Sequence, residues 1–401
     1  MLKLKIFNII VRYIYILNYQ FAQVDIIGYF FGYINFIVLG IFGLSLLVQL
    51  YYYLGIYFRF TFHKNKLKKI PAEPVSVIIC ARNEAANLDK YLPSILNQDY
   101  PDYEVIVVND CSTDDTDEII GKYLKKYPRL RTTTINQDRK FTHGKKLAVT
   151  VGVKAAKHEL LVFTDADCEV VSRDWLKLMQ RHFNNKTSIV LGYGGFFHKK
   201  SLLNNYIRYD ALTIAIQYFS YAIAGFPYMG VGRNMAYRKS LFFKNKGFAN
   251  HYHLLSGDDD LFVNETADKT NTAVEYSIES HTRCEAKNSF ISWIEQKKRH
   301  VSTAKYYRKK HKRLLGLEML SRVIYYASFV YLAISSVFLI YVLPAFALRM
   351  IIQLLLTKIS MRRLNEKYLL LTSLFFDIFS LFINLIIFIS YRFRRKKNKW
   401  K

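Results

Sequence analysis

Three long apolar stretches without a charged residue most constrain how this chain can fold. They run from residue 26 to 58, from 323 to 348 and from 368 to 376, and after Asp377 the last stretch resumes and continues to residue 391. A helix needs about 20 apolar residues to cross the hydrocarbon core of a bilayer. All three stretches reach that length, the last with one interior acid. The sequence therefore predicts a membrane protein, with buried core helices as the alternative for each stretch.

These stretches divide the chain into segments, and the first of them is predicted to be a retained anchor because no small-residue cleavage site follows it. The predicted order is an amphipathic leader (1–25), an N-terminal transmembrane helix (26–58), a cytoplasmic domain (70–288), an interfacial basic amphipathic helix (289–316), a C-terminal transmembrane region of two or three helices (317–391) and a basic cytoplasmic tail (392–401).

The positive charge of the chain gathers next to the apolar stretches. The formal net charge is +27, and much of it lies in "RFTFHKNKLKK", "KKRHVSTAKYYRKKHKR" and "RFRRKKNKWK". Lys and Arg accumulate in loops on the cytoplasmic side of membranes, where they also meet anionic lipid. Nucleic-acid binding is the competing explanation, and it is disfavoured because the charge follows the membrane ends rather than one domain face.

The number of C-terminal spans cannot be read directly from the charges. A cytoplasmic domain and a cytoplasmic tail require an even number of spans between them, yet several basic residues would then lie outside. We therefore expect the segment "LRMIIQLLLTKISMRRL" to be interfacial or re-entrant. The basic residues concerned are Arg349, Lys358, Arg362, Arg363 and Lys367.

The four cysteines are far apart in the sequence and lack the spacing of a metal site. They are Cys80, Cys111, Cys168 and Cys284. Free thiols are typical of a reducing compartment, so the sequence predicts four unpaired cysteines on the cytoplasmic side.

Between residues 74 and 167, continuous apolar segments alternate with amphipathic ones. Strands are predicted at 75–81, 104–110, 130–136 and 159–167, each of the first three followed by a helical pattern. Continuous apolar strands alternating with helices indicate a parallel sheet covered on both faces. Ligands bind at the carboxyl ends of the strands in such sheets.

Acidic side chains follow the predicted strands at that edge. Asp110 ends the second strand, and Asp165 and Asp167 end the fourth with one residue between them. Hard divalent cations such as Mg²⁺ and Mn²⁺ prefer oxygen ligands and are often held by one or two carboxylates together with substrate phosphates. Two acids at i and i+2 of a strand share a face. The alternative is a turn in which the acids cap a helix.

Seven stretches in one order resemble the family-2 glycosyltransferases of the GT-A fold. They are "VSVIICARNEAANL", "EVIVVNDCSTDDT", "HGKKLAVTVGVKAA", "FTDADCEV", "GVGRNMAYRK", "SGDDDLFVN" and "QKKRHVS", within residues 74 to 305. The resemblance implies an α/β, Rossmann-like mixed and mostly parallel sheet in a cytoplasmic domain (70–288), with transmembrane helices at both ends. It implies a multi-pass protein of the bacterial inner membrane.

The resemblance also implies roles for individual residues on the side of the site that binds the donor. Asp110 would contact the base of the nucleotide, Asp165 the nucleotide-sugar, and Asp167 would ligate Mn²⁺ or Mg²⁺. The residues that would line the nucleotide or its phosphates are Ala81, Arg82, Glu84, Lys145 and Arg299. For Lys145 the alternative is an exposed helix lysine.

On the acceptor side, the resemblance makes one acid of "SGDDDLFVN" the general base, Asp258 ahead of Asp259. The alternative is a cluster of acids at a helix N-terminus, where negative charge is favourable. Gly230 and Gly232 would bring backbone amides near the phosphates or the acceptor. Asp377, inside the last apolar stretch, receives no role, although intramembrane acids are costly.

Taken together, the resemblance implies a metal-dependent, inverting hexosyltransferase that moves a sugar from a UDP- or GDP-linked donor to a hydroxyl of a lipid-linked or membrane-associated acceptor in cell-envelope synthesis. Two alternatives remain. One is a processive polysaccharide synthase, which "QKKRH" disfavours because His300 stands where the Gln-x-x-Arg-Trp box has Trp. The other is an inactive membrane scaffold that binds nucleotide-sugars.

Overall fold

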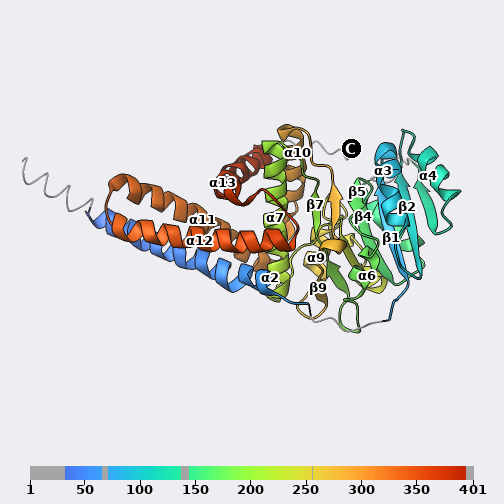
Figure 1. The fold of residues 1–401 in the computed structure, drawn as a ribbon, viewed down its shortest axis with the longest axis horizontal. Coiled ribbons are helices and arrows are strands. Elements are labelled where there is room, and N and C mark those ends of the chain that lie inside the picture. Colours follow the sequence, from blue (N-terminus) through green and yellow to red (C-terminus); the bar gives the residue numbers. More distant parts are fainter. Residues whose placement is uncertain (1–31, 66–70, 137–143, 255, 394–401) are drawn as a thin grey trace, which may run out of the picture. The chain divides into compact units, whose positions relative to one another are not determined.

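The structure is a computed structural model that describes residues 32–65, 71–136, 144–254 and 256–393. The predicted leader and most of the predicted tail lie outside these residues. The chain divides into two compact units, one of residues 1–52 and 316–352 and one of residues 53–315 and 353–401. Figure 1 shows both units.

Four helices are long and apolar enough to cross a membrane: Gly32–Phe62, Lys309–Ser335, Leu339–Arg363 and Leu370–Ile387. The first is α-helical except for its π-helical segment η1 (Tyr51–Tyr57), and it ends with α2 (Phe58–Phe62). The others correspond to α11 (Lys309–Ser335), α12 (Leu339–Arg363) and most of α13 (Leu370–Phe393). Candidate membrane helices are therefore present near the N-terminus and in the C-terminal part of the chain, as predicted.

The smaller unit packs the first helix against parts of α11 and α12. Phe42 stacks on Tyr325 with ring centroids 5.2 Å apart, and Phe329 stacks on Phe346 at 3.8 Å. These contacts align three apolar helices along their aromatic faces, as side-chain packing does in membrane helix bundles.

The segment around Arg349, which we expected to be interfacial or re-entrant, belongs to one continuous helix, α12. Arg349 is fully buried, and it donates hydrogen bonds to the hydroxyl of Tyr326 at 2.7 Å and to the side-chain oxygen of Gln49 at 3.2 Å. These partners compensate a guanidinium that is buried within the protein.

The larger unit is built on a seven-stranded sheet in the order β3-β2-β1-β4-β8-β6-β9. Strands β1 to β4 are parallel to one another, whereas β8 runs antiparallel to both β4 and β6. The sheet is thus mixed and mostly parallel in its first half, as predicted. The strands are β1 (Val75–Ala81), β2 (Tyr103–Asp110), β3 (Leu130–Ile135), β4 (Leu160–Asp165), β6 (Ile189–Leu191), β8 (Met235–Arg238) and β9 (Thr272–Val274).

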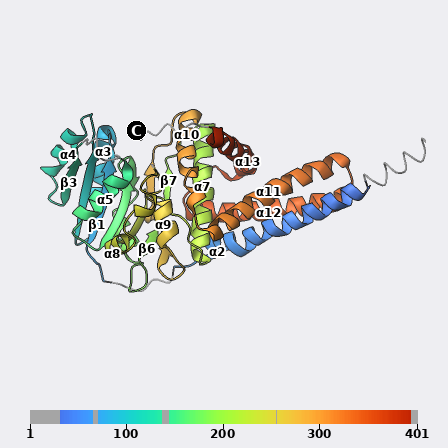
Figure 2. The ribbon, with the colours of Figure 1, turned by 180° about the vertical axis from the view of Figure 1, so that it is seen from behind.

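Helices cover both faces of this sheet. One face packs a core of β1, β2 and β4 side chains against α3 (Ala85–Leu96), α4 (Thr116–Leu124) and α6 (Trp175–Gln180). The other face carries α5 (Lys145–Ala155), which lies over the strands in Figure 2. Gly152 lets α5 approach closely, since a Cβ there would come within 2.6 Å of a methyl group of Ile78. This close packing holds α5 against the sheet.

A second, three-stranded sheet in the order β5-β10-β7 completes the unit, with β5 (Cys168–Val170), β7 (Gly194–Phe196) and β10 (Thr282–Cys284). The antiparallel pairing of β5 and β10 places Cys168 opposite Cys284, and these two residues form a disulfide. The prediction of four free thiols is therefore wrong. Sequence separation gives no sign of the pairing, because it is the fold that brings residues 116 positions apart together.

The remaining helices surround the small sheet and the second half of the large one. They are α7 (Leu202–Ile223), α8 (Lys239–Lys244), α9 (Asp260–Thr266) and α10 (Phe290–Val301), with short 3₁₀ turns at η2 (Ala249–His251), η3 (Ile278–Ser280) and η4 (Ala304–Tyr306). The predicted interfacial segment 289–316 thus contains α10, η4 and the first turns of α11.

The connection between α12 and α13 is tied to this unit by a buried acid. Glu366 accepts from Arg208 at 2.6 Å and from the hydroxyl of Tyr193 at 2.9 Å, and it also pairs with Arg283 of β10. The side chain of Glu366 is fully buried. A buried carboxylate with several charged and polar partners is held firmly, because losing a partner would leave a charge without compensation.

Candidate active site

The turns after β1 and β2 are joined by hydrogen bonds. Asn83 has a φ of 55°, and its side-chain oxygen accepts from the backbone N–H of Thr113 at 2.8 Å. The backbone N–H of Asn83 in turn donates to the hydroxyl of Ser112 at 3.0 Å. As a result Arg82 lies beside the buried carboxylate of Asp110, with 4.0 Å between their charged atoms. These hydrogen bonds hold the ends of β1 and β2 together.

Asp165 and Asp167 lie at the neighbouring strand end. Asp165 is the last residue of β4, and Asp167 belongs to the turn that leads into β5. Both therefore stand at the carboxyl edge of the sheet, but the turn and not a strand face places Asp167. Burial and the negative charges of Asp165 and Glu84 raise the pKa of Asp167 to about 6. The cluster holds more negative charge than its surroundings neutralise.

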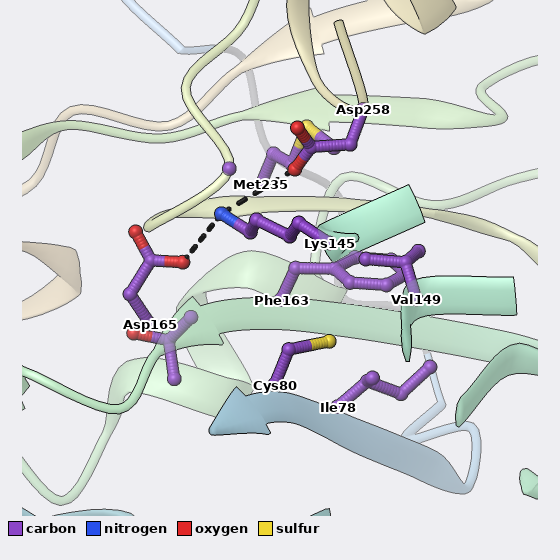
Figure 3. A pocket seen from close by; sticks show the side chains of 10 residues that line it. Ile78, Cys80, Lys145, Val149, Phe163, Asp165, Met235 and Asp258 are labelled. Carbon is purple, nitrogen blue, oxygen red and sulfur yellow. Dashed lines mark hydrogen bonds and ion pairs between the residues drawn. The ribbon is translucent and has the colours of Figure 1, made fainter. Parts of the chain in front are cut away.

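Lys145 links these acids to the second half of the domain. Its ammonium nitrogen lies 2.7 Å from a carboxylate oxygen of Asp165 and 3.3 Å from one of Asp258, as the dashed lines in Figure 3 show. Burial opposes the charge of Lys145, but the surrounding carboxylates outweigh it and raise its pKa well above the usual value. Burial also disfavours the ionised form of Asp165, but Lys145 outweighs it and holds the pKa of Asp165 below its usual value.

A cavity surrounds this bridge. Figure 3 shows Lys145 above the apolar floor formed by β1 and β4, with the two acids on either side of it. Lys145 occupies this position because it is the first residue of α5, whose packing on the sheet is fixed by Gly152. The lining residues are Ile78, Cys80, Lys145, Val149, Phe163, Thr164, Asp165, Gly232, Met235 and Asp258.

The three consecutive acids before α9 have three different partners. Asp258 faces Lys145. Asp259 caps α9, because its carboxylate accepts from the backbone N–H groups of Gly232 and Asp260 at 2.8 and 2.7 Å. Asp260 accepts from the hydroxyl of Tyr307 at 2.7 Å and also from that of Thr303. The helix-cap explanation thus fits Asp259, while Asp258 lines the cavity.

Electrostatics further separates the members of this triplet. Burial and the charges of Asp258 and Asp260 raise the pKa of Asp259 to about 7. Burial raises the pKa of Asp260 as well, although its two hydroxyl partners oppose the shift. Three adjacent acids can share one small region because two of them are stabilised by backbone or hydroxyl donors.

The remaining predicted residues are placed as follows. Ala81 is fully buried in the core below the site, so only its backbone can reach a ligand. Glu84 precedes α3 and accepts from Asn87 at 2.5 Å, and burial raises its pKa. Arg299 is exposed on α10, and within the described part of the chain it forms no ion pair. The structure therefore brings Arg82, Asp110, Lys145, Asp165, Asp167 and Asp258 to one edge of the sheet.

Arg233 also belongs to this region, although the sequence does not predict a role for it. Its guanidinium lies 4.5 Å from the ring centre of Phe196 and donates to the carbonyl of Gly194 at 2.9 Å. From this position its charge helps to lower the pKa values of both Asp165 and Asp167. The only signal in the sequence was its place in "GVGRNMAYRK", which does not reveal where the side chain points.

The residues present fit a divalent cation at Asp167. Its carboxylate takes part in no ion pair among the described residues, and its pKa is raised by burial and by the neighbouring acids, both of which a bound cation would offset. Side-chain donor atoms of Asp167, Cys168 and Cys284 lie within 4.8 Å of one another, but the two sulfurs are bonded together. The available donor is thus a hard oxygen, which suits Mg²⁺ or Mn²⁺.

Sequence comparison finds relatives that match this domain. Two of them are a poly-beta-1,6-N-acetyl-D-glucosamine synthase of Staphylococcus epidermidis, 31% identical over 39% of this chain, and a beta-monoglucosyldiacylglycerol synthase of a Nostoc species, 31% identical over 30% of it. The matches span 39% and 25% of the lengths of those proteins. The similarity thus concerns a part of each relative.

Comparison with solved structures supports the fold. A mannosyltransferase of Pyrobaculum calidifontis, PcManGT, solved with GDP-Man and Mn²⁺, superimposes with a TM-score of 0.56 at 17% identity, over 82% of this chain and 98% of that one. At this identity the likeness concerns the GT-A fold alone. The family model "Glycosyl transferase family 2" matches residues 76–243, which contain the strand ends, Lys145 and Arg233. This part of the chain therefore matches glycosyl transferase family 2.

Proposed function

We propose that this protein is a membrane-anchored, inverting glycosyltransferase. It transfers a sugar from a UDP- or GDP-linked donor to a hydroxyl group of a membrane-associated acceptor. The single observation that carries this proposal is the Lys145 bridge, which joins a strand-end acid, Asp165, to Asp258 of the acid triplet. An ordinary helix lysine would lie in solvent rather than between two carboxylates.

In this proposal the donor binds at the ends of β1, β2 and β4. Asp110 and Arg82 contact the nucleoside, and Asp165 contacts the sugar. A divalent cation held by Asp167 neutralises the diphosphate as it leaves. Lys145 and Arg233 add positive charge on the same side, and fixed cations stabilise negative charge that develops on a leaving group.

Asp258 is the proposed general base. It takes the proton of the acceptor hydroxyl, whose oxygen attacks the anomeric carbon as the bond to the diphosphate breaks. The carboxylate lines the cavity, which a base must do to reach a substrate proton. Asp259 is less suited, because backbone N–H groups already donate to both of its oxygens.

The proposed acceptor is a lipid or a lipid-linked molecule, and the proposed location is the cell membrane with the catalytic domain on the cytoplasmic side. Four candidate membrane helices support the membrane location. One similar protein is a synthase of a glucosyldiacylglycerol, which is a lipid product. Transfer of a single sugar to such a lipid is the form of the reaction that we favour.

A processive polysaccharide synthase is the second candidate, because another similar protein is a poly-N-acetylglucosamine synthase. His300 stands in place of the Trp of the Gln-x-x-Arg-Trp box and argues against chain elongation. The length of the product separates the two candidates: a single sugar per acceptor supports our proposal, whereas a ladder of sizes supports polymer synthesis.

The experiment is a screen of UDP- and GDP-sugars with the purified full chain in lipid nanodiscs, with Mn²⁺ or Mg²⁺ and a membrane-lipid extract as acceptor. We expect one donor to release nucleoside diphosphate and to label a lipid. The matched control is the Asp258→Asn protein, which should bind the same donor without turnover. Absence of release with every donor, or equal release by the control, would contradict the proposal.

A further inference from the structure

Helix α13 packs along the larger unit rather than standing apart from it. It contacts α7 and α10, and Figures 1 and 2 both draw it beside these two helices. The rings of Phe376 and Phe379 meet Tyr206 of α7 edge to face, at 5.2 and 5.1 Å between centroids. Ile383 and Ile387 are also buried, so the packed face extends along most of the helix.

The single acidic residue of α13 lies on this packed face. Asp377 is only 2% exposed, next to the buried Phe376. A carboxylate is expensive in hydrocarbon. In α13 it is turned toward protein, so the opposite face of the helix is free of charge.

That opposite face is a continuous apolar row. Its members recur every three or four residues, which is the spacing of one side of a helix. The exposed residues are Leu371 (84%), Phe375 (61%), Ile378 (39%), Phe382 (60%), Leu385 (52%), Ile386 (53%) and Ile389 (46%). A row of this length and exposure on a packed helix indicates an apolar environment outside the protein.

The segment between α12 and α13 is packed within the larger unit. Arg363, the last residue of α12, donates to the carbonyl of His63 at 2.7 Å, and Glu366 is buried among Arg208, Arg283 and Tyr193 of the larger unit. If α11 leaves across the membrane and α12 returns, the start of α13 is on the side of the catalytic domain.

The positive charge of residues 392–401 bears on whether α13 crosses the membrane. A third crossing would carry "RFRRKKNKWK" away from the side of the catalytic domain. Basic segments of this kind favour the cytoplasmic side and its anionic lipids. The mean hydropathy of Leu370–Ile387, 2.2, is high enough for a span, but one side of that apolar surface is already used against α7 and α10.

We infer that α13 does not cross the membrane. It lies in the plane of the lipid surface that faces the catalytic domain, with its apolar row in the acyl boundary. Helices that bind in this way combine an apolar face with flanking basic residues. Together with α10, whose Ile291 is 74% exposed, α13 would seat the catalytic domain on the bilayer.

The first test compares the sides of the membrane on which three epitope tags lie. The tags are inserted at the exposed Lys246 of the catalytic domain, in the turn at 336–338 between α11 and α12, and at the C-terminus. Antibody binding is measured on sealed vesicles of both orientations. We expect the C-terminal tag to follow the Lys246 tag, and the 336–338 tag to lie opposite. A C-terminal tag opposite Lys246, or a 336–338 tag on the same side, would overturn the inference.

The second test measures depth in the membrane. Spin labels are placed at Leu371, Phe382 and Ile389 of the full chain in anionic nanodiscs, with the identically labelled unsubstituted protein as background for Cys80 and Cys111. An in-plane helix holds all three labels at similar depth. In a span, Phe382 would lie about 16 Å further along the membrane normal than Leu371, since a helix rises about 1.5 Å per residue. A deep Phe382 between two shallower labels would refute the in-plane position.

Discussion

The two halves of the active site hold their acids in different ways. At the end of β4, Asp165 and Asp167 lie close together, and no described basic residue pairs with Asp167. Before α9, Asp259 and Asp260 are both engaged by donors of the protein, and only Asp258 lines the cavity. The carboxylate of Asp167 thus leaves a negative charge that a bound cation can neutralise. Asp259 and Asp260, in contrast, are held by donors of the protein, and Asp258 faces the cavity.

The largest expected effect is that of Asp258→Asn, which tests whether one acid of the triplet is chemically distinct. Asn keeps the shape of the side chain but cannot accept the hydroxyl proton, so we expect kcat to fall by about 10²–10⁴-fold. The KM for the sugar nucleotide should change little, because the effect is on the transition state. Steady-state release of nucleoside diphosphate measures both. If Asp260→Asn lowered kcat equally while remaining folded, the distinction between these acids would fail.

The next effect concerns the lysine that joins the halves. In Lys145→Met, the carboxylates of Asp165 and Asp258 lose the cation between them, and the phosphates lose a positive partner. We expect kcat/KM to fall about 100-fold, as is typical when one electrostatic partner of a transition state is removed.

Lys146→Met is the matched control for that variant. Lys146 is buried and donates to the carbonyls of His251 and Leu254 at 2.6 and 3.1 Å, so its role is structural. The control should lower Tm and change the kcat/KM of the folded protein by only a few-fold. Equal losses of kcat/KM in the two variants would mean that position 145 has no special role.

A smaller effect distinguishes structural acids from those of the site. The side chain of Glu275 is fully buried, and although burial favours the neutral acid, His182 and Arg181 lower the pKa of Glu275 from about 4.5 to about 2. Because the folded-state pKa is the lower one, this stabilisation is complete above about pH 4.5 and is lost as the pH falls toward 2.

Glu275→Gln tests that linkage. The shift in pKa corresponds to about 3 kcal/mol at neutral pH. We expect the variant to lose stability at pH 7 and to show a shallower decline of stability between pH 4.5 and 2. Chemical denaturation followed at several pH values measures the difference. A variant whose curve runs parallel to that of the unsubstituted protein would contradict the prediction.

The smallest effect is expected for Asp259→Asn. Asn is nearly as good as Asp at a helix N-terminus, but its amide can accept only one of the two backbone bonds well. We expect a loss of about 1 kcal/mol in stability and a decrease in kcat below tenfold. Thermal unfolding and turnover, measured on the same preparation, check both. A loss of kcat as large as that of Asp258→Asn would transfer the role of base to Asp259.

The same contrast explains how much the sequence could predict. The parallel strands and their acidic ends follow from local patterns, since β1 was predicted at its observed bounds and Asp110 and Asp165 end β2 and β4 as expected. Parallel strands also bring their carboxyl ends together, so a shared edge for these acids could be predicted without coordinates.

The rest depends on contacts between distant residues that no local pattern encodes. The disulfide joins residues 116 positions apart, and Glu366 reaches Arg208 across 158 positions. Arg233 is one basic residue among 58, and only the fold places it beside Asp165 and Asp167. The division of labour within the acid triplet is equally non-local, because it is set by Gly232, Lys145, Thr303 and Tyr307.

The central claim is that the acids at the strand ends hold a cation that carries the diphosphate of a donor. Calorimetric titration of UDP and GDP, with and without Mn²⁺, into the unsubstituted, Asp167→Asn and Asp258→Asn proteins tests it most directly. We expect Mn²⁺-dependent binding that survives in Asp258→Asn and is lost in Asp167→Asn. Nucleotide binding by Asp167→Asn with unchanged affinity and unchanged dependence on Mn²⁺ would contradict it.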